Sequence, residues 1–342
     1  MTIQARLTPH PTQVNARIVV LLPLYNGAKF LRPQLDSILA QSFENTLILC
    51  RDDGSRDDSP QIVAEYASLH PERFVLLQDS LGNLGARGSF SCLMEAALRL
   101  TENAAQTGLI SYFALADQDD IWHPQKLARL LDEMLSLETN HTSEPALVHG
   151  DLRVVDENGR EIAPSMASYQ GLRPELDSLA AQLISNTVTG CTALMNRALL
   201  ELSTPVPPAA IMHDWWISLV ASAFGRRVYL EETLADYRQH GNNTIGAKEW
   251  TQRHRYQMKP GLASLPKNIY HVMRVLVIMS QRMFDDEHNE AFQNTARQAK
   301  AFKDYFGHRL PLGGRITVRF ACGMGIHFPP LQRLLFKTLR HL

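Results

Sequence analysis

The sequence predicts an α/β fold in which helices cover a mixed, mostly parallel sheet, with a helical, basic extension at the C-terminal end. Two observations support this prediction. Short apolar runs alternate with amphipathic segments between residues 17 and 115, and clusters of acidic residues directly follow two of those runs. Such alternation forms βαβ units, which right-handed crossovers assemble into one sheet. The 342 residues suffice for one α/β domain with appendages.

The first half of the chain gives the clearest elements. Arg17 to Leu24 (RIVVLLPL) is a continuous apolar run, typical of a strand buried on both faces. Ala28 to Gln41 carries its apolar residues at helical spacing and predicts a helix. The same patterns predict strands at Thr46–Cys50, Phe74–Gln78 and Leu109–Leu115, helices at Ser59–Leu69 and Ser89–Leu100, and a glycine-rich turn at Gly82–Gly88.

Beyond residue 145 the pattern is looser. Residues 146–156 predict a strand, the polar stretch Ala163–Asp177 a loop, and the mixed section 183–245 includes a helix at Met212–Phe224. From about Trp250 the sequence is helical and basic, with a helix at Ile269–Met283 and a terminal amphipathic run, 331–342, after two prolines. We therefore expect a leader over 1–16, a main domain over 17–247 and an extension over 248–342.

The composition excludes several classes of protein. With 45% hydrophobic and 20% charged residues, the chain is neither collagen-like nor wholly disordered. Its four cysteines are far apart and form no C-x-x-C pair, which favours a reducing compartment and argues against structural zinc. No run approaches the roughly 20 apolar residues of a membrane span, and the N-terminus lacks a secretory apolar region. We therefore expect a cytoplasmic protein.

The charge is unevenly distributed. From Lys248 onward there are 16 basic and 6 acidic residues, a net charge of +10, whereas the preceding residues carry −11. This asymmetry indicates either an anionic partner for the extension or a solvated helical face.

One acidic cluster predicts a cation site. Asp117-Gln118-Asp119-Asp120 follows an apolar strand, and adjacent carboxylates repel one another unless a cation intervenes. Mg²⁺ prefers oxygen ligands and commonly uses one or two carboxylates together with substrate phosphates, so a diphosphate is the expected ligand. The alternative is a surface acidic turn without a metal.

The second acidic turn and the glycine-rich turn are candidates for nucleotide contacts. Asp52 and Asp53 also follow a strand, where a carboxylate can accept the imide N–H of uracil or thymine, although such residues equally cap helices and form turns. In Gly82–Gly88, which matches neither G-x-G-x-x-G nor the Walker pattern, Arg87 offers a charged fork for phosphate or a base carbonyl.

Two later segments carry candidate acid–base groups. Asp214 in His213-Asp214-Trp215-Trp216 begins an apolar helix, and desolvation by the indoles would raise its pKa toward that of a general base. A helix N-cap is the alternative. His240, in the polar run YRQHGNN, can ligate a metal, pair with phosphate or be an ordinary loop residue.

Together these segments resemble the inverting family 2 glycosyltransferases of the GT-A fold, over about residues 17 to 246. The resemblance rests on VVLLPLYNGAKFLRPQLDSILAQSF, RDDGSRDDS, NLGARGSF, FALADQDDIWHPQKL, HDWW and YRQHGNN, in that order. The sequences of the last three segments are most similar to bacterial rhamnosyltransferase-type members that build O-antigen and other cell-surface polysaccharides.

The resemblance implies roles for individual residues. Asp214 matches the catalytic base, Asp119 the direct metal ligand and Asp117 a ligand of ribose or metal, while His240 matches a position that completes the metal site in some members. The nucleotide and donor would be bound by Pro23, Tyr25, Asp52, Asp53, Arg87, Asp117 and Gln118. The role of Asp120 is left open. Residues 17–123 would form the nucleotide-binding half and 124–247 the acceptor half.

The implied reaction is a single inverting displacement on a nucleotide-diphospho-sugar, dependent on Mg²⁺ or Mn²⁺. The implied donor is dTDP-rhamnose and the acceptor a lipid-linked saccharide in lipopolysaccharide synthesis; the basic extension would attach peripherally to the cytoplasmic face of the inner membrane, or serve docking or oligomerisation. Two alternatives are a UDP-hexose (glucosyl, galactosyl or N-acetylhexosaminyl) transferase and a non-catalytic subunit that binds nucleotide-sugars. No nucleic-acid partner is expected, and a Rossmann dehydrogenase is excluded because the glycine fingerprint is missing.

Overall fold

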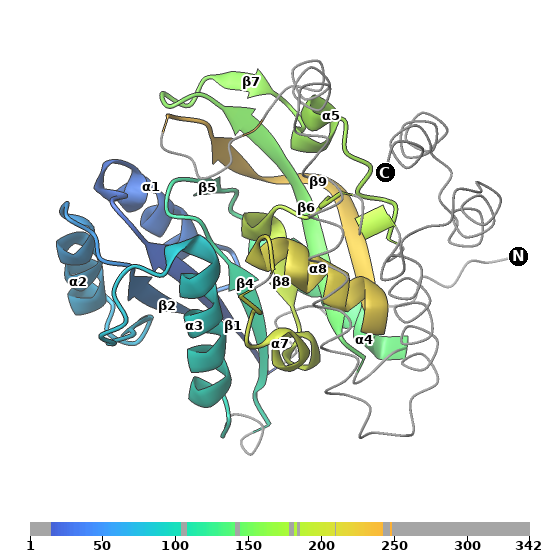
Figure 1. Ribbon diagram of the computed structural model, residues 1–342, viewed down its shortest axis with the longest axis horizontal. Coiled ribbons are helices and arrows are strands. Elements are labelled where there is room, and N and C mark those ends of the chain that lie inside the picture. The colour runs from blue at the N-terminus through green and yellow to red at the C-terminus, as the bar shows by residue number, and fades with distance from the viewer. Residues whose placement is uncertain are drawn as a thin grey trace, which may run out of the picture.

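The computed structural model describes residues 15–103, 108–140, 144–177, 181–182, 185–208, 210–241 and 247 (Figure 1). The predicted leader up to residue 14 and the whole 248–342 extension, with its predicted helix at 269–283 and terminal run 331–342, lie outside the described residues. Within them, no helix is long and apolar enough to cross a bilayer.

The described residues form one nine-stranded mixed sheet with the strand order β3-β2-β1-β4-β8-β6-β9-β5, and β7 pairs with β6 off this path. Strands β1, β2, β3 and β4 are mutually parallel, as are β6 and β9, whereas β8 is antiparallel to both β4 and β6. The strand bounds are β1 Ala16–Leu24, β2 Thr46–Asp52, β3 Phe74–Leu76, β4 Ile110–Leu115, β5 Ile121–Trp122, β6 Ala146–Val155, β7 Glu161–Ala163, β8 Ala193–Met195 and β9 Arg226–Arg238.

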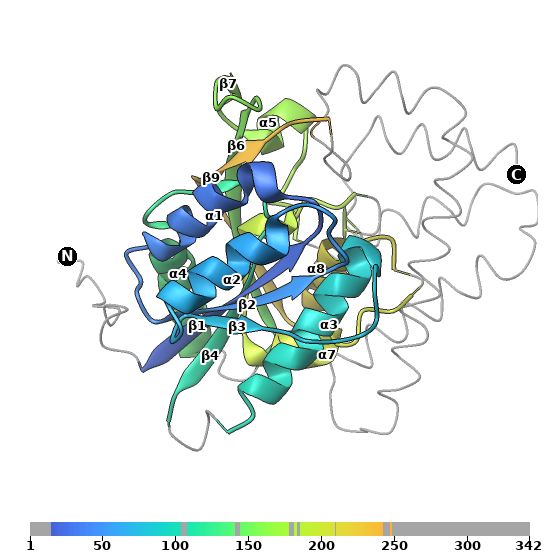
Figure 2. The ribbon, with the colours of Figure 1, turned by 90° about the vertical axis from the view of Figure 1, so that its left-hand side faces the viewer.

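Helices cover both faces of the sheet, as Figure 2 shows. On one face α1 (Ala28–Leu39), α2 (Ser59–Leu69) and α4 (Lys126–Asn140) bury Leu35, Ile62 and Leu130 against the strands. On the other face α3 (Gly85–Leu100), α7 (Arg197–Ser203) and α8 (His213–Phe224) bury Phe90, Leu199 and Ile217. Strand β1 supplies alternate residues to the two cores, Val20 to the first and Val19 to the second, which explains its continuous apolar sequence.

Three sequence-based boundaries need correction. Helix α3 begins at Gly85 and not at Ser89, because the carboxylate of Asp53 accepts the backbone N–H groups of Leu84 and Gly85 at its start. Arg87 therefore lies in a helix and not in a turn. The predicted loop after Ala163 contains helix α5 (Met166–Gln170), whose N-cap Ser165 accepts from the amide of Ser168. The mixed section also contains the long strand β9, which pairs with β6.

Candidate active site

The predicted site residues gather at the carboxyl end of the parallel strands. Strand β1 lies between β2 and β4, and its last residue, Leu24, pairs with Asp52. Just beyond β4, the amide of Gln118 accepts a hydrogen bond from the backbone N–H of Tyr25 and donates one to its C=O, both 2.9 Å. The two acidic turns therefore lie at one edge of the sheet, as expected for loops at the ends of parallel strands.

Residues 117–120 form an acidic loop whose carboxylates are close together. Oxygen atoms of Asp117 and Asp120 and the sulfur of Cys191 all lie within 4.8 Å of one another. Burial, and then the charges of neighbouring carboxylates, raise the pKa of Asp117 well above its ordinary value and that of Asp120 to about 7. Full ionisation of these carboxylates is therefore disfavoured at neutral pH unless a cation is bound nearby.

Two basic residues, Lys126 and Arg238, lie next to the acidic loop. The side chain of Lys126 is fully buried, lies 3.5 Å from the ring centroid of Trp122 and donates to the carbonyl oxygen of Cys191. Burial lowers the pKa of Lys126 to about 7. Arg238, at the end of β9, donates from Nε to the carbonyl oxygen of Asp119 at 3.1 Å. Its backbone N–H lies 3.4 Å from Asp120 Oδ1, a contact that gives Asp120 a place in the structure of the loop.

His240 lies against the acidic loop. Its Nε2 is 2.8 Å from Oδ2 of Asp119, and its ring stacks on Phe30 of α1 with centroids 4.5 Å apart. Burial raises the pKa of Asp119, while the hydrogen bond with His240 opposes that shift. The structure thus brings together two residues that lie 121 positions apart in the sequence and that were predicted as metal ligands.

The donor set of the loop fits a hard divalent cation. Asp117 and Asp120 place carboxylate oxygens, the ligands that Mg²⁺ and Mn²⁺ accept, within 4.8 Å of one another. Asp119 lies outside this cluster, but its charge also raises the pKa of Asp117, and an added positive charge would relieve the repulsion among the three carboxylates. The Cys191 thiol fits such a cation less well, because burial raises its pKa well above the ordinary value and keeps it protonated.

Asp214 lies at the start of α8, beside the acidic loop. Its Oδ1 accepts from the N–H of Trp215 at 2.6 Å and its Oδ2 from the N–H of Gly190 at 3.2 Å, and the Asn186 side chain adds a hydrogen bond. Burial nevertheless raises the pKa of Asp214 to about 6. The charge of Asp214 also contributes to the raised pKa of Asp117, so the two carboxylates act on one another.

The two aspartates after β2 have different surroundings. Asp52 is partly exposed and accepts from the N–H groups of Gly54 and Ser55 within its own turn. Asp53 is 3% exposed and forms a buried ion pair with Arg51, whose guanidinium also binds Asp79. The carboxylate of Asp53 is thus enclosed by protein groups, and its predicted contact with the nucleotide stays a prediction. Pro23 and Tyr25 line the end of β1, with Tyr25 49% exposed.

Arg87 has protein partners in the described structure. Its Nη1 donates to the carbonyl oxygens of Pro208 and Ala210, at 2.6 and 2.9 Å. These oxygens belong to the segment that leads into α8, so the guanidinium connects α3 to the segment that carries Asp214. The predicted contact with phosphate or base remains a prediction.

Sequence reasoning did not find several residues that shape this site, namely Arg51, Lys126, Asn186, Gly190, Cys191 and Arg238. Two of these residues carried a local signal. Lys126 lies on the apolar face of an amphipathic helix, and Arg51 directly follows the apolar run of a strand. Gly190 carried no local signal. Its role appears only in three dimensions, where an added Cβ would lie 3.1 Å from His213 Nε2 and 3.4 Å from Asp214 Cβ.

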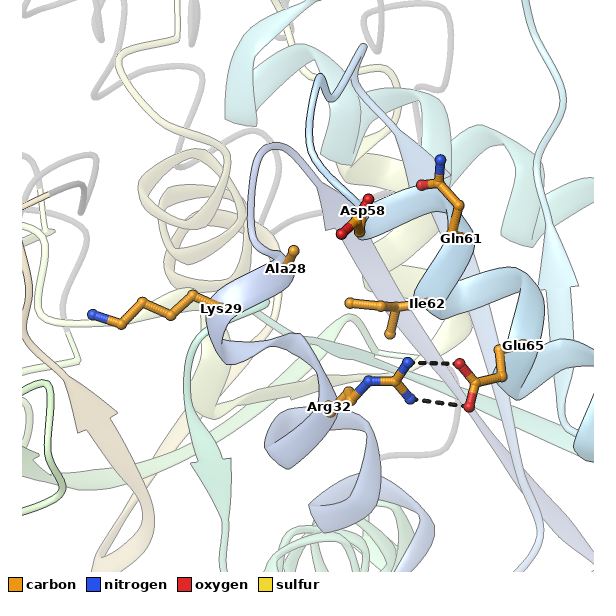
Figure 3. Close-up of a pocket in the computed structure, with 7 residues that line it drawn as sticks. All are labelled: Ala28, Lys29, Arg32, Asp58, Gln61, Ile62 and Glu65. Carbon is orange, nitrogen blue, oxygen red and sulfur yellow. Dashed lines mark hydrogen bonds and ion pairs between the residues drawn. The ribbon is translucent and has the colours of Figure 1, made fainter.

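A separate groove of about 490 Å³ lies between α1 and α2 (Figure 3). Arg32 and Glu65 form a two-pronged ion pair across it, with N–O distances of 3.1 and 2.6 Å. Its lining consists of Ala28, Lys29, Arg32, Asp58, Gln61, Ile62 and Glu65, none of which is a predicted site residue.

The described residues form a mixed α/β sheet that carries an acidic loop at the carboxyl ends of its parallel strands. The chain belongs to glycosyl transferase family 2, whose sequence profile matches residues 19–202, more than half of the chain. The predictions of this family, of a glycosyltransferase and of the GT-A fold are confirmed.

Relatives agree with this assignment. An uncharacterized glycosyltransferase of Nostoc sp. is 29% identical over 255 residues, which cover 72% of each chain. An uncharacterized protein of Mycobacterium tuberculosis is 27% identical over 68% of this chain and 61% of its own. The crystal structure of TarS from S. aureus matches with a TM-score of 0.50 and 17% identity over 85% of this chain and 43% of TarS, a likeness of fold. The chain thus spans less than two thirds of the latter two proteins.

Proposed function

We propose that this chain is an inverting glycosyltransferase that moves a sugar from a nucleoside diphosphate to a saccharide hydroxyl, with Asp214 as the general base. One observation carries the proposal: a carboxylate with its pKa raised to about 6 lies beside an acidic loop suited to a cation and a diphosphate. A base with a pKa just below neutrality is ionised at working pH and still accepts a proton readily.

Asp214 would take the proton from the acceptor hydroxyl as its oxygen bonds to the anomeric carbon of the donor. The bond from that carbon to the diphosphate oxygen breaks in the same displacement, so the configuration inverts and the nucleoside diphosphate leaves. The N–H of Gly190 and the side chain of Asn186 hold the carboxylate for this transfer. Asp119, with Asp117 and His240, would hold a Mg²⁺ or Mn²⁺ ion that stabilises the departing diphosphate charge.

The proposed donor is dTDP-rhamnose. Support comes from the sequences of the acidic loop, HDWW and YRQHGNN, which resemble those of the rhamnosyltransferase-type members. Asp52 and the exposed Tyr25, at the ends of neighbouring strands, would contact the nucleobase. A UDP-hexose is the second candidate, because an imide N–H is common to uracil and thymine.

The experiment is isothermal titration of the purified chain with dTDP, UDP and GDP, each with and without Mn²⁺. Asp119→Ala is the test variant, and Glu102→Ala, an exposed acid just beyond α3, is the control. Mn²⁺-dependent binding that prefers dTDP and is lost only in Asp119→Ala supports the rhamnosyl proposal. Preference for UDP moves the donor to a UDP-hexose, and preference for GDP contradicts both donors. Binding of none of the three contradicts the proposed function.

We further propose a lipid-linked saccharide acceptor and peripheral attachment at the cytoplasmic face of the inner membrane, in O-antigen synthesis. The support is the terminal run 331–342, which combines leucines with Arg333, Lys337 and Arg340. The test is co-sedimentation of the full chain with anionic vesicles, compared with a variant that carries glutamate at those three positions. Equal sedimentation of the two chains would contradict attachment through this run.

A further inference from the structure

We propose that helix α3 fixes the position of the general base relative to the nucleotide loops, with Arg87 and His213 as the positioning residues. The proposal rests on the proposed function, because it takes Asp214 as the base. It assigns to Arg87 a role different from the phosphate contact that its sequence context predicts.

The N-terminus of α3 is fixed to the turn after β2, which carries residues of the proposed nucleotide site. The carboxylate of Asp53 accepts the N–H groups of Leu84 and Gly85, each at 2.8 Å, where the helix begins. Asp53 is itself held by the buried guanidinium of Arg51 and directly follows Asp52. The start of α3 is therefore held against the turn that carries Asp52, the carboxylate proposed to bind the nucleobase.

The same helix contacts the segment that leads to the general base. Arg87 donates to the carbonyl oxygens of Pro208 and Ala210, and Ser91 Oγ accepts from the N–H of Val206 at 3.0 Å. Phe90 stacks on His213, with ring centroids 3.8 Å apart and an interplanar angle of 23°. Positions 87, 90 and 91 share one face of α3, so this face supplies the contacts to Val206, Pro208, Ala210 and His213.

His213 acts through its shape. Its ring is 5% exposed, and neither nitrogen has a hydrogen-bond partner in the described part of the chain. Burial lowers the pKa of His213 to about 3, so the ring is neutral at working pH. It lies between Phe90 and the space that a Cβ of Gly190 would occupy, and Gly190 donates to Asp214. The ring thus spaces α3 from the backbone group that orients the base.

The position of Arg87 is explained by these contacts. A positive side chain in the first turn of a helix opposes the helix dipole, and the two carbonyl oxygens offset that cost. Loss of these contacts should displace the segment before α8, and with it Asp214, without removing a group from the nucleotide.

The experiment uses the full chain and compares Arg87→Ala with Arg99→Ala, an exposed arginine near the other end of α3. The readouts are the Kd for UDP and dTDP with Mn²⁺, the rate of nucleoside diphosphate release from UDP-glucose and dTDP-rhamnose, and hydrogen exchange of peptides spanning 206–216. We expect Arg87→Ala to keep the Kd within about threefold, to lower turnover at least tenfold and to speed exchange in 206–212. Arg87→Lys should restore part of the turnover.

A second pair of variants tests His213. His213→Phe keeps a flat ring against Phe90 and should retain most of the turnover, whereas His213→Ala should lose it. Inactivity of His213→Phe, in a chain that melts like the wild type, would show that the nitrogens are needed and would overturn the positioning role.

For Arg87, a Kd raised tenfold or more would show a direct nucleotide contact, and unchanged turnover or exchange would show that no positioning occurs. Either result overturns the inference. If the wild type binds no nucleoside diphosphate, the proposed function fails, and the exchange measurement still decides whether Arg87 holds residues 206–212.

Discussion

Replacement of Asp214 by asparagine should lower turnover by a large factor and also make the protein more stable above neutral pH. Asparagine keeps one oxygen, which can accept from Gly190, but its NH2 group cannot accept the hydrogen bond from Trp215 and the amide cannot take a proton. General-base catalysis contributes about 100- to 10,000-fold to rates, so turnover should fall by about that factor. For the wild type, kcat/KM should rise with pH through about 6 and then level off, because only the ionised carboxylate accepts a proton.

The effect on stability follows from the same pKa. Burial raises the pKa of Asp214 from 3.8 to about 6, so the folded chain disfavours the ionised form. The stability that this group contributes is complete below its unfolded pKa and is lost as pH rises through the folded value. A shift of about two pKa units corresponds to at most about 3 kcal/mol, the cost that the neutral asparagine avoids at pH 8.

The assay combines initial rates between pH 5 and 9 with urea unfolding of both chains at pH 5 and pH 8. The stability gap in favour of Asp214→Asn should widen by about 1 kcal/mol between the two pH values. Retention of more than a tenth of the wild-type turnover, or a rate profile flat across pH 6, would refute the assignment of Asp214 as base. Either result would mean that the proton of the acceptor hydroxyl is taken by a group other than Asp214, whereas a wild-type chain that binds nucleotide-sugar but shows no turnover would favour the alternative of a non-catalytic nucleotide-sugar-binding subunit.

Three further substitutions, one of them with a matched exposed control, test other parts of the site. His240→Ala should weaken Mn²⁺ binding about 10- to 100-fold, measured by electron paramagnetic resonance, because His240 would help to hold the ion and also orients the carboxylate of Asp119. Unchanged affinity would show that His240 takes no part in metal binding. Arg51→Met should cost about 3 to 5 kcal/mol in urea unfolding because it leaves a buried carboxylate unpaired. Arg32→Met removes one partner of an exposed, solvent-screened pair and should cost much less; equal costs would contradict this reasoning. Lys126→Met should cost about 1 to 3 kcal/mol because the Cys191 carbonyl loses its donor, and an unchanged unfolding midpoint would count against that contact.

Much of the fold could be predicted from local patterns. The strand at 17–24 and the helix at 59–69 were found to within a residue, because apolar periodicity and turn residues report on local backbone conformation. The meeting of the two acidic turns was also predictable, since both follow parallel strands. The start of α3 was not predictable, because its cap is the side chain of Asp53, 32 residues before Gly85.

The sequence by itself determined which chemical groups this protein carries, the order of most of its elements and the family to which it belongs. Only the tertiary structure decided which of two adjacent aspartates is buried, where the guanidinium of Arg87 points, and that His240 meets Asp119. The physical reason is distance along the chain: Arg87 and Pro208 are 121 residues apart. Burial and hydrogen bonding depend on such partners, so the pKa values and the roles of these side chains arise only when the sheet brings them together.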